Sequence, residues 1–114
     1  MIEKLTEPLT PAEENLVPNY VDRLQKRQGK KKAVTIEVMR KAIIDLSEVQ
    51  MLKIIHHIRI KGLVPLLVHD ETGYYVAQSR QEVVDAANRI KDIEDMCWKE
   101  RNSLMQQVEV SWLK

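Results

Sequence analysis

The chain has 114 residues, of which 44% are hydrophobic and 31% charged, as is usual for a single soluble globular domain. Phe is absent and the aromatic fraction is 4%, so the core is expected to be aliphatic. No apolar run approaches the roughly 20 residues of a membrane helix, and the charged first residues are unlike a secretory signal. The single cysteine, Cys97, excludes an internal disulfide and a multi-cysteine zinc site and favours a cytoplasmic location.

The charge is divided along the chain. Residues 1–20 hold four Glu and one Lys, net −3, and residues 21–62 hold eleven Lys or Arg against four Asp or Glu, net +7. Residues 63–114 hold six basic residues against nine acidic ones, net −3. A basic middle between acidic flanks predicts a surface that faces phosphate groups. The alternative is that these charges are scattered over a solvated surface without a ligand.

A first helix is predicted from residue 11 to about residue 28. Thr10 is a good N-cap, Pro11 suits the first helical position, and Glu13 completes a capping box. Pro18 is expected to kink this helix or to start a new one. The apolar residues that follow recur with helical spacing and should face the core. They are Leu16, Val17, Tyr20, Val21 and Leu24.

A short strand and a second helix are expected next. Ala33-Val34 has the length of a single strand rung, and Thr35 can cap a helix. A tight turn is predicted at Asp45-Leu46. The buried stripe of this helix is predicted to consist of Val38, Met39, Ala42 and Ile43.

The third helix carries signals at both ends. Ser47 and Gln50 form a second capping box, and Gly62 is placed to end the helix after Lys61. Its apolar positions follow the spacing i, i+3, i+4, i+7. They are Met51, Ile54, Ile55 and Ile58.

A β-hairpin and a long helix complete the predicted order. Residues 63–68 and 74–77 are β-prone and flank a polar turn that contains Gly73. Ser79 and Glu82 form a third capping box, and no Gly or Pro follows before about Val110. A roughly heptad stripe runs along this helix and is interrupted by Glu100 and Arg101. It comprises Val83, Ala86, Ala87, Ile90, Ile93, Cys97, Leu104 and Val108.

This order predicts a mainly α fold with a small β-hairpin, namely a winged helix-turn-helix followed by a long C-terminal helix. Residues 1–9 would form an N-terminal arm, residues 10–78 the winged helix-turn-helix domain, and residues 79–114 the long helix. In helix-turn-helix proteins the second helix of the pair enters the major groove of DNA. Here that helix would be 48–61, and the hairpin would be the wing.

Several short stretches resemble small winged-helix proteins of bacteriophages, prophages and related mobile elements. The stretches are Ile55, Ile58-Arg59, Gly62-Leu63-Val64-Pro65, Gly73-Tyr74-Tyr75-Val76-Ala77, Thr35 and Ser79-Arg80-Gln81-Glu82. In that group a recognition-like helix ends at a Gly, a short strand follows, and a Gly-Tyr-Tyr strand returns from the wing. The resemblance covers roughly residues 33–95 and implies a winged-helix fold and a DNA-binding role, in regulating transcription or replication.

The candidate DNA contacts form two groups. On helix 48–61 one side is shared by Gln50, Lys53, His57 and Lys61. Gln can read adenine and Lys can reach guanine or phosphate; the alternative is a solvated helix face. The second group, suited to phosphate contacts because flexible cations release counterions, comprises Arg23, Lys26, Arg27, Lys30, Lys31 and Lys32. The predicted partner is double-stranded DNA.

The tip of the predicted wing carries Asp70 and Glu71, which phosphate would repel. Either the wing stays off DNA, or this surface binds a protein. The second function hypothesis is therefore a winged-helix protein–protein adaptor that does not bind DNA.

Neither an enzyme nor a metal site is predicted. His56 and His57 are adjacent and point about 100° apart on a helix, so they are poorly placed to share one ion. There is no Gly-rich phosphate loop, HExxH or nucleophile elbow. Cys97 lies on the apolar stripe of the last helix, where a buried small hydrophobe is expected. No cofactor is predicted.

The last helix is longer than a small core can cover. Its predicted interface residues are Met96, Leu104, Met105, Val108 and Trp112. We expect a homodimer in which this helix contacts its symmetry mate, because a two-fold interface needs only one self-complementary patch. The alternative is that this helix packs on helix 11–28 of the same chain.

Overall fold

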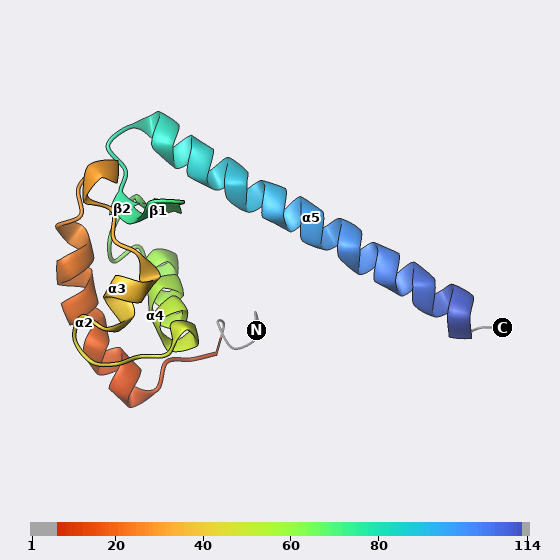
Figure 1. Cartoon of the computed structure of the whole chain (residues 1–114), viewed down its shortest axis with the longest axis horizontal. Helices are drawn as coiled ribbons and strands as arrows, with labels where there is room; N and C mark the ends of the chain where they lie inside the picture. The colour runs from red at the N-terminus through yellow and green to blue at the C-terminus, as the bar shows by residue number, and fades with distance from the viewer. Residues whose placement is uncertain (1–6, 113–114) are drawn as a thin grey trace. The chain divides into compact units, whose positions relative to one another are not determined.

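The computed structural model describes residues 7–112, with side chains through residue 108. Along the chain the elements are α2 (Pro11–Gln25), the 3₁₀ helix η1 (Lys30–Lys32), α3 (Ile36–Arg40), α4 (Glu48–Lys61), β1 (Leu67–Asp70), β2 (Gly73–Val76) and α5 (Arg80–Trp112) (Figure 1). The prediction of a mainly helical chain with one small hairpin and a long last helix is confirmed. Contacts divide the chain into two units, residues 1–83 and 84–114, which are described in turn.

Helix α2 begins at the predicted capping box. The Thr10 hydroxyl accepts from the Glu13 amide at 3.2 Å, and the Glu13 carboxylate accepts from the Thr10 amide at 2.9 Å. Pro18 lies inside one continuous helix, so the prediction that it starts a new helix is wrong. The helix ends at Gln25, before the predicted residue 28, because the chain then pairs with β2: the Gly29 amide donates to the carbonyl of Val76 at 2.9 Å.

The hairpin is antiparallel, with a register that runs from Leu67 opposite Val76 to Asp70 opposite Gly73. Val34 adds a single rung on the other edge of β2, exchanging two backbone hydrogen bonds with Tyr74 at 2.8 and 2.9 Å. The predicted one-rung strand is therefore confirmed. A side chain at Gly73 would place its Cβ 2.5 Å from the carbonyl oxygen of Val34, so this close approach requires glycine.

Both helices between the rung and the hairpin begin as predicted. The Thr35 hydroxyl caps α3, and Ser47 and Gln50 form the capping box of α4. Gly62 ends α4 with a φ of 63°, the left-handed conformation that glycine adopts most easily. The predicted inward stripe of α3 is wrong at Val38, which is 56% exposed while its neighbour Met39 is buried. It is also wrong at Ala42, because α3 ends at Arg40, before a second turn can face the core.

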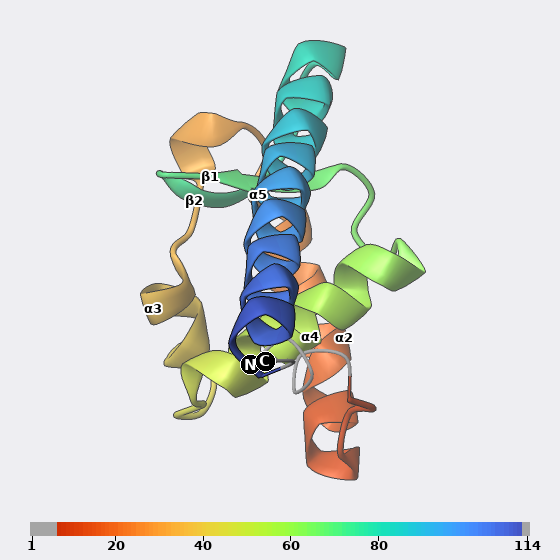
Figure 2. The same ribbon diagram turned by 90° about the vertical axis from the view of Figure 1, so that its right-hand side faces the viewer.

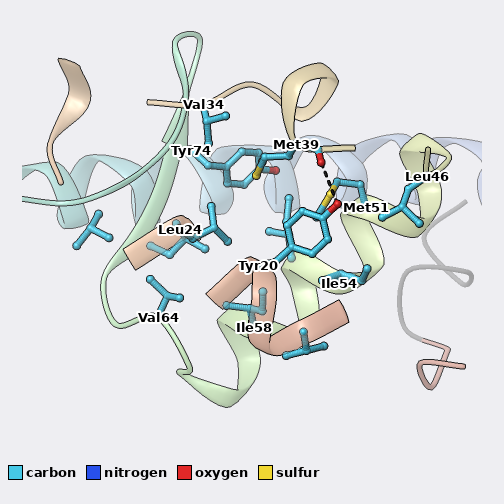
Figure 3. Close-up of a cluster of buried hydrophobic side chains, with 14 residues drawn as sticks. Tyr20, Leu24, Val34, Met39, Leu46, Met51, Ile54, Ile58, Val64 and Tyr74 are labelled. Atoms are coloured by element: carbon cyan, nitrogen blue, oxygen red, sulfur yellow. Dashed lines mark hydrogen bonds between the residues drawn. The ribbon is translucent and has the colours of Figure 1, made fainter. Parts of the chain in front are cut away.

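The core of the first unit lies where α2, α3, α4 and the hairpin meet, and α4 crosses α2 (Figure 2). All four predicted inward positions of α4 are buried, each with at most 2% of its surface exposed. Each such side chain contributes roughly 1.5–3 kcal/mol on burial. Tyr20 lies among them and donates its hydroxyl to the carbonyl of Met39 at 2.9 Å (Figure 3). The predicted tight turn at Asp45-Leu46 is wrong: the turn lies at residues 41–42, directly after α3, and Leu46 is part of the core.

The second unit consists of α5 from residue 84 onward. The start of α5 has half of the predicted capping box: the Ser79 hydroxyl accepts from the Glu82 amide at 3.2 Å, but the Glu82 carboxylate accepts from the Gln78 amide at 2.7 Å. The helix then continues for 33 residues without interruption. Within residues 7–112, no helix combines the length and apolar character needed to cross a membrane.

Candidate functional site

Lys53, predicted to project from α4 toward DNA, is instead buried. Its Nζ lies 2.8 Å from a carboxylate oxygen of Glu13, and the two side chains are 9% and 4% exposed. Burial acts to raise the pKa of Glu13, but the hydrogen bonds from Lys53 and Thr10 outweigh it and hold the pKa below its usual value. The prediction that Lys53 lies on an outer side of the helix available to DNA is wrong, and so is the alternative of a solvated face, because α2 brings an acidic partner to Lys53.

The other three predicted residues of α4 do not form one exposed array. The Gln50 side chain is exposed but accepts from the Ser47 amide at 3.0 Å, which completes the helix cap. His57 is half-buried and Lys61 is exposed. Residues 7–9 lie beside this face: together with α4 they line a hollow of about 150 Å³ whose α4 side is formed by Lys53, His56, His57, Ile60 and Lys61.

A second surface gathers four of the six cations predicted to contact phosphate. The last turns of α2 and the end of η1 line an open groove of about 690 Å³. We call this the basic groove; its lining residues are Asn19, Asp22, Arg23, Lys26, Arg27, Lys32 and Ile43. It thus holds four cationic side chains and one carboxylate.

Ion pairing leaves the basic groove predominantly positive. Asp22 pairs with Lys26 at 3.3 Å, but both side chains are more than two thirds exposed, and such a pair contributes little. Arg27 donates to the carbonyl of Lys32 at 3.5 Å, which links α2 to η1. Lys31, the next residue along η1, is exposed but does not line the groove.

Lys30 contacts the hairpin tip rather than the groove. Its Nζ lies 3.4 Å from Asp70 and 3.7 Å from Glu71, and hydrogen bonding to Asp70 with the charges of both carboxylates raises the pKa of Lys30. The acidic tip is therefore partly neutralised. Nothing in the sequence spacing indicates this contact, because it depends on η1 being tied to β2.

Asp70 is the most strongly held of these groups. Burial acts to raise its pKa, but the Thr72 hydroxyl and amide, the Tyr75 hydroxyl and Lys30 all stabilise the charged form and bring the pKa to about 2. The Tyr75 hydroxyl donates to Asp70 at 3.1 Å and the Thr72 amide at 2.8 Å. The charge of the Asp70 carboxylate is thus paired with groups of the hairpin and with Lys30.

The predicted interface side chains of α5 are exposed. The exposed fraction is 53% for Met96, 61% for Leu104, 56% for Met105 and 40% for Val108. The side chain of Trp112 lies outside the described residues. Cys97 is exposed, so the prediction that it is buried is wrong for the single chain.

Among residues 7–112, no three His, Cys, Asp or Glu side chains lie close enough together to hold a metal ion. Comparisons of the chain with models of protein families, with curated proteins and with solved structures give no match. The resemblance to winged-helix proteins of phages and mobile elements therefore stays a prediction.

Proposed function

We propose that residues 10–78 form a winged helix-turn-helix domain that binds double-stranded DNA, chiefly through the phosphate backbone. The element order supports this fold: a helix, a strand rung, two helices joined by the segment 41–47, and a hairpin. The pairing supports it too, because Val34 and β1 lie on opposite edges of β2. In such a domain α4 is the second helix of the helix-turn-helix pair.

The observation that carries the proposal is the basic groove. Arg23, Lys26, Arg27 and Lys32 come from two elements and converge on one concave surface. Lys and Arg side chains supply most phosphate contacts in protein–DNA complexes, and each phosphate neutralised releases counterions into solution. Four cations on one surface therefore suit a regular array of phosphates.

The same reasoning predicts little sequence preference. Base reading needs side chains such as Gln, Lys or Arg that reach base edges in the major groove. Of the four α4 residues predicted to contact DNA, Lys53 is held by Glu13, Gln50 caps its own helix and His57 is half-buried, so only Lys61 has an exposed side chain not engaged in these contacts. Contacts that only position the protein on the backbone carry no direct sequence information. We therefore expect similar affinities for duplexes of different sequence.

The test compares two double variants that remove the same charge. Arg23→Gln with Lys32→Gln removes two cations from the basic groove, whereas Lys91→Gln with Lys99→Gln removes two exposed cations from α5. Fluorescence anisotropy with a random-sequence duplex would be recorded over a series of salt concentrations. The groove variant should lower the slope of log affinity against log salt by about 2, at about 0.9 per phosphate contact.

The α5 variant should match the unaltered chain, since its charges are far along the sequence from the groove. Circular dichroism would verify that both variants are folded. If the groove variant and the α5 variant bind the duplex equally, the basic groove is not the DNA-binding surface and the proposal fails.

A protein–protein adaptor is the second candidate, and one observation favours it. Val38 in α3 and Ile44, four residues after the end of α3, are 56% and 51% exposed, and exposed apolar side chains of this kind suit contact with a protein. An adaptor of this kind predicts no retention of the chain on duplex DNA even at low salt, which the same anisotropy series would reveal.

A further inference from the structure

We infer that α5 pairs with α5 of a second copy of this chain as an antiparallel coiled coil. This inference concerns a different surface from the DNA-binding proposal and does not depend on it. It rests on the spacing, the exposure and the charge pattern of residues 90–108.

An apolar seam runs along α5 at coiled-coil spacing. Ile90, Cys97 and Leu104 follow one another at seven-residue intervals, Ile93 lies three residues after Ile90, and Val108 lies four residues after Leu104. We call these five residues the seam. A seven-residue repeat keeps one helix face turned toward a partner helix; Ile90, Ile93, Cys97 and Leu104 fit this repeat, whereas Gln107 holds its next position and Val108 lies beside that position. Trp98 and Met105, which directly follow Cys97 and Leu104, are also apolar, but each is turned about 100° from the seam.

The seam is exposed in the single chain. The exposed fractions are 40% for Ile90, 54% for Ile93, 61% for Leu104 and 40% for Val108, and Cys97 is also exposed. Of the other nine positions between residues 91 and 101, seven are charged, and the two apolar ones, Met96 and Trp98, are exposed beside the seam. An isolated helix in water gains little stability without packing of such a face. A second copy offers the same stripe with the same repeat.

The charge pattern determines the direction of pairing. Glu100 lies three residues after Cys97, at a position that faces the partner helix. In a parallel, in-register pair Glu100 would lie directly opposite Glu100 of the second copy, and like charges facing each other are unfavourable. An antiparallel pair avoids this juxtaposition, because it sets Glu100 against Cys97 of the second copy.

The antiparallel register also matches the apolar and charged positions. Leu104 then faces Ile93 of the second copy, and two-fold symmetry repeats the contact. Beside the seam, Glu94 lies next to Arg101 of the second copy, again twice. Two aliphatic contacts and two pairs of opposite charge thus form in one register, which also sets Ile90 opposite Gln107 of the second copy. Such charge complementarity selects partner orientation in coiled coils.

Sedimentation of the intact chain without DNA tests the pairing. We expect a dimer at tens of micromolar, and we expect Leu104→Glu to give a folded monomer because it introduces a charge into the seam. Met105→Glu is the matched control: Met105 is 56% exposed and lies off the seam, so this variant should remain a dimer. A monomeric intact chain, a larger oligomer, or dissociation by both variants alike would overturn the inference.

Disulfide trapping tests the direction. In a Cys97→Ser background, one chain carries Ile93→Cys and a second chain of different mass carries Leu104→Cys. Under mild oxidation the antiparallel pair gives the mixed disulfide, with at least a several-fold excess over either symmetric disulfide. Predominant symmetric disulfides would show parallel pairing and overturn the proposed direction.

The charge pairs provide a third readout. Arg101→Glu places two acidic groups beside each other in the antiparallel register, and it should weaken the dimer by about 10-fold. Adding Glu94→Arg to Arg101→Glu exchanges the two charges and should restore the dimer. Failure of the double variant to recover would contradict the proposed register.

Discussion

The apolar stripes of α4 and α5 have different surroundings. In α4 the stripe formed by Met51, Ile54, Ile55 and Ile58 has at most 2% of each side chain exposed. In α5 the seam residues Ile90, Ile93, Leu104 and Val108 are 40–61% exposed. The comparison shows that helical periodicity reports which face is apolar, whereas the neighbours of the helix decide whether that face belongs to a core or to an interface.

Shortening one side chain of each stripe should distinguish a core stripe from an exposed one. The largest change in stability is expected from the α4 variant. Ile54→Ala removes fully buried side-chain atoms and should lower the free energy of unfolding of the first unit by about 3 kcal/mol. Leu104→Ala should leave that free energy unchanged, because no core surrounds Leu104 in the second unit. Urea denaturation at a protein concentration too low for pairing provides the measurement. Equal losses in the two variants would mean that the two stripes have the same role.

The buried ion pair between Lys53 of α4 and Glu13 of α2 can be tested separately. Lys53→Met leaves the Glu13 carboxylate buried without its cation and should lower the free energy of unfolding by about 3 kcal/mol. Adding Glu13→Gln removes the unpaired charge, so the double variant should lose less than the single variant. Urea denaturation of the unaltered chain, both single variants and the double variant completes the cycle. Strictly additive losses would contradict a direct ion pair.

A smaller effect is expected from pH. Because the pKa of Asp70 is about 2 in the folded chain and near 3.8 when unfolded, its contribution to stability is complete above about pH 5 and declines as the pH falls toward 2. This contribution should be about 1–2 kcal/mol once solvent screening is allowed for. The pKa of Glu13 is lowered as well, so both carboxylates contribute to the loss of stability at low pH.

Asp70→Asn isolates the Asp70 part. Between pH 4 and pH 2 the stability of this variant should fall less than that of the unaltered chain, and thermal unfolding at each pH measures the difference. Identical pH profiles would mean that the hairpin tip does not hold Asp70 as described.

Much of the fold could be predicted because its signals are local. Thr10, Ser47 and Gly62 mark helix ends through bonds to residues three or four positions away, and the inward stripe of α4 follows from helical spacing alone. The end of α2 and the exposed side of α3 were predicted less well. Both depend on strand pairing and helix length, which are decided by tertiary contacts.

The candidate site was harder to predict for the same reason. The pairs Glu13–Lys53 and Lys30–Asp70 join residues forty positions apart, and helical spacing alone places Lys53 on an outer face. The sequence already explains Glu13 as the residue that completes the helix cap. Its second role, as the ion-pair partner of Lys53, is therefore not apparent from the sequence. The four cations of the basic groove, by contrast, are close in sequence, and all four were predicted as phosphate contacts.

We propose that the basic groove binds the phosphate backbone of duplex DNA, and the affinity of the intact chain at two salt concentrations measures that binding. With four phosphate contacts, the affinity for a random-sequence duplex should fall by about 100-fold between 50 and 200 mM salt. Absence of binding at 50 mM salt, or an affinity that does not change between the two concentrations, would contradict the claim.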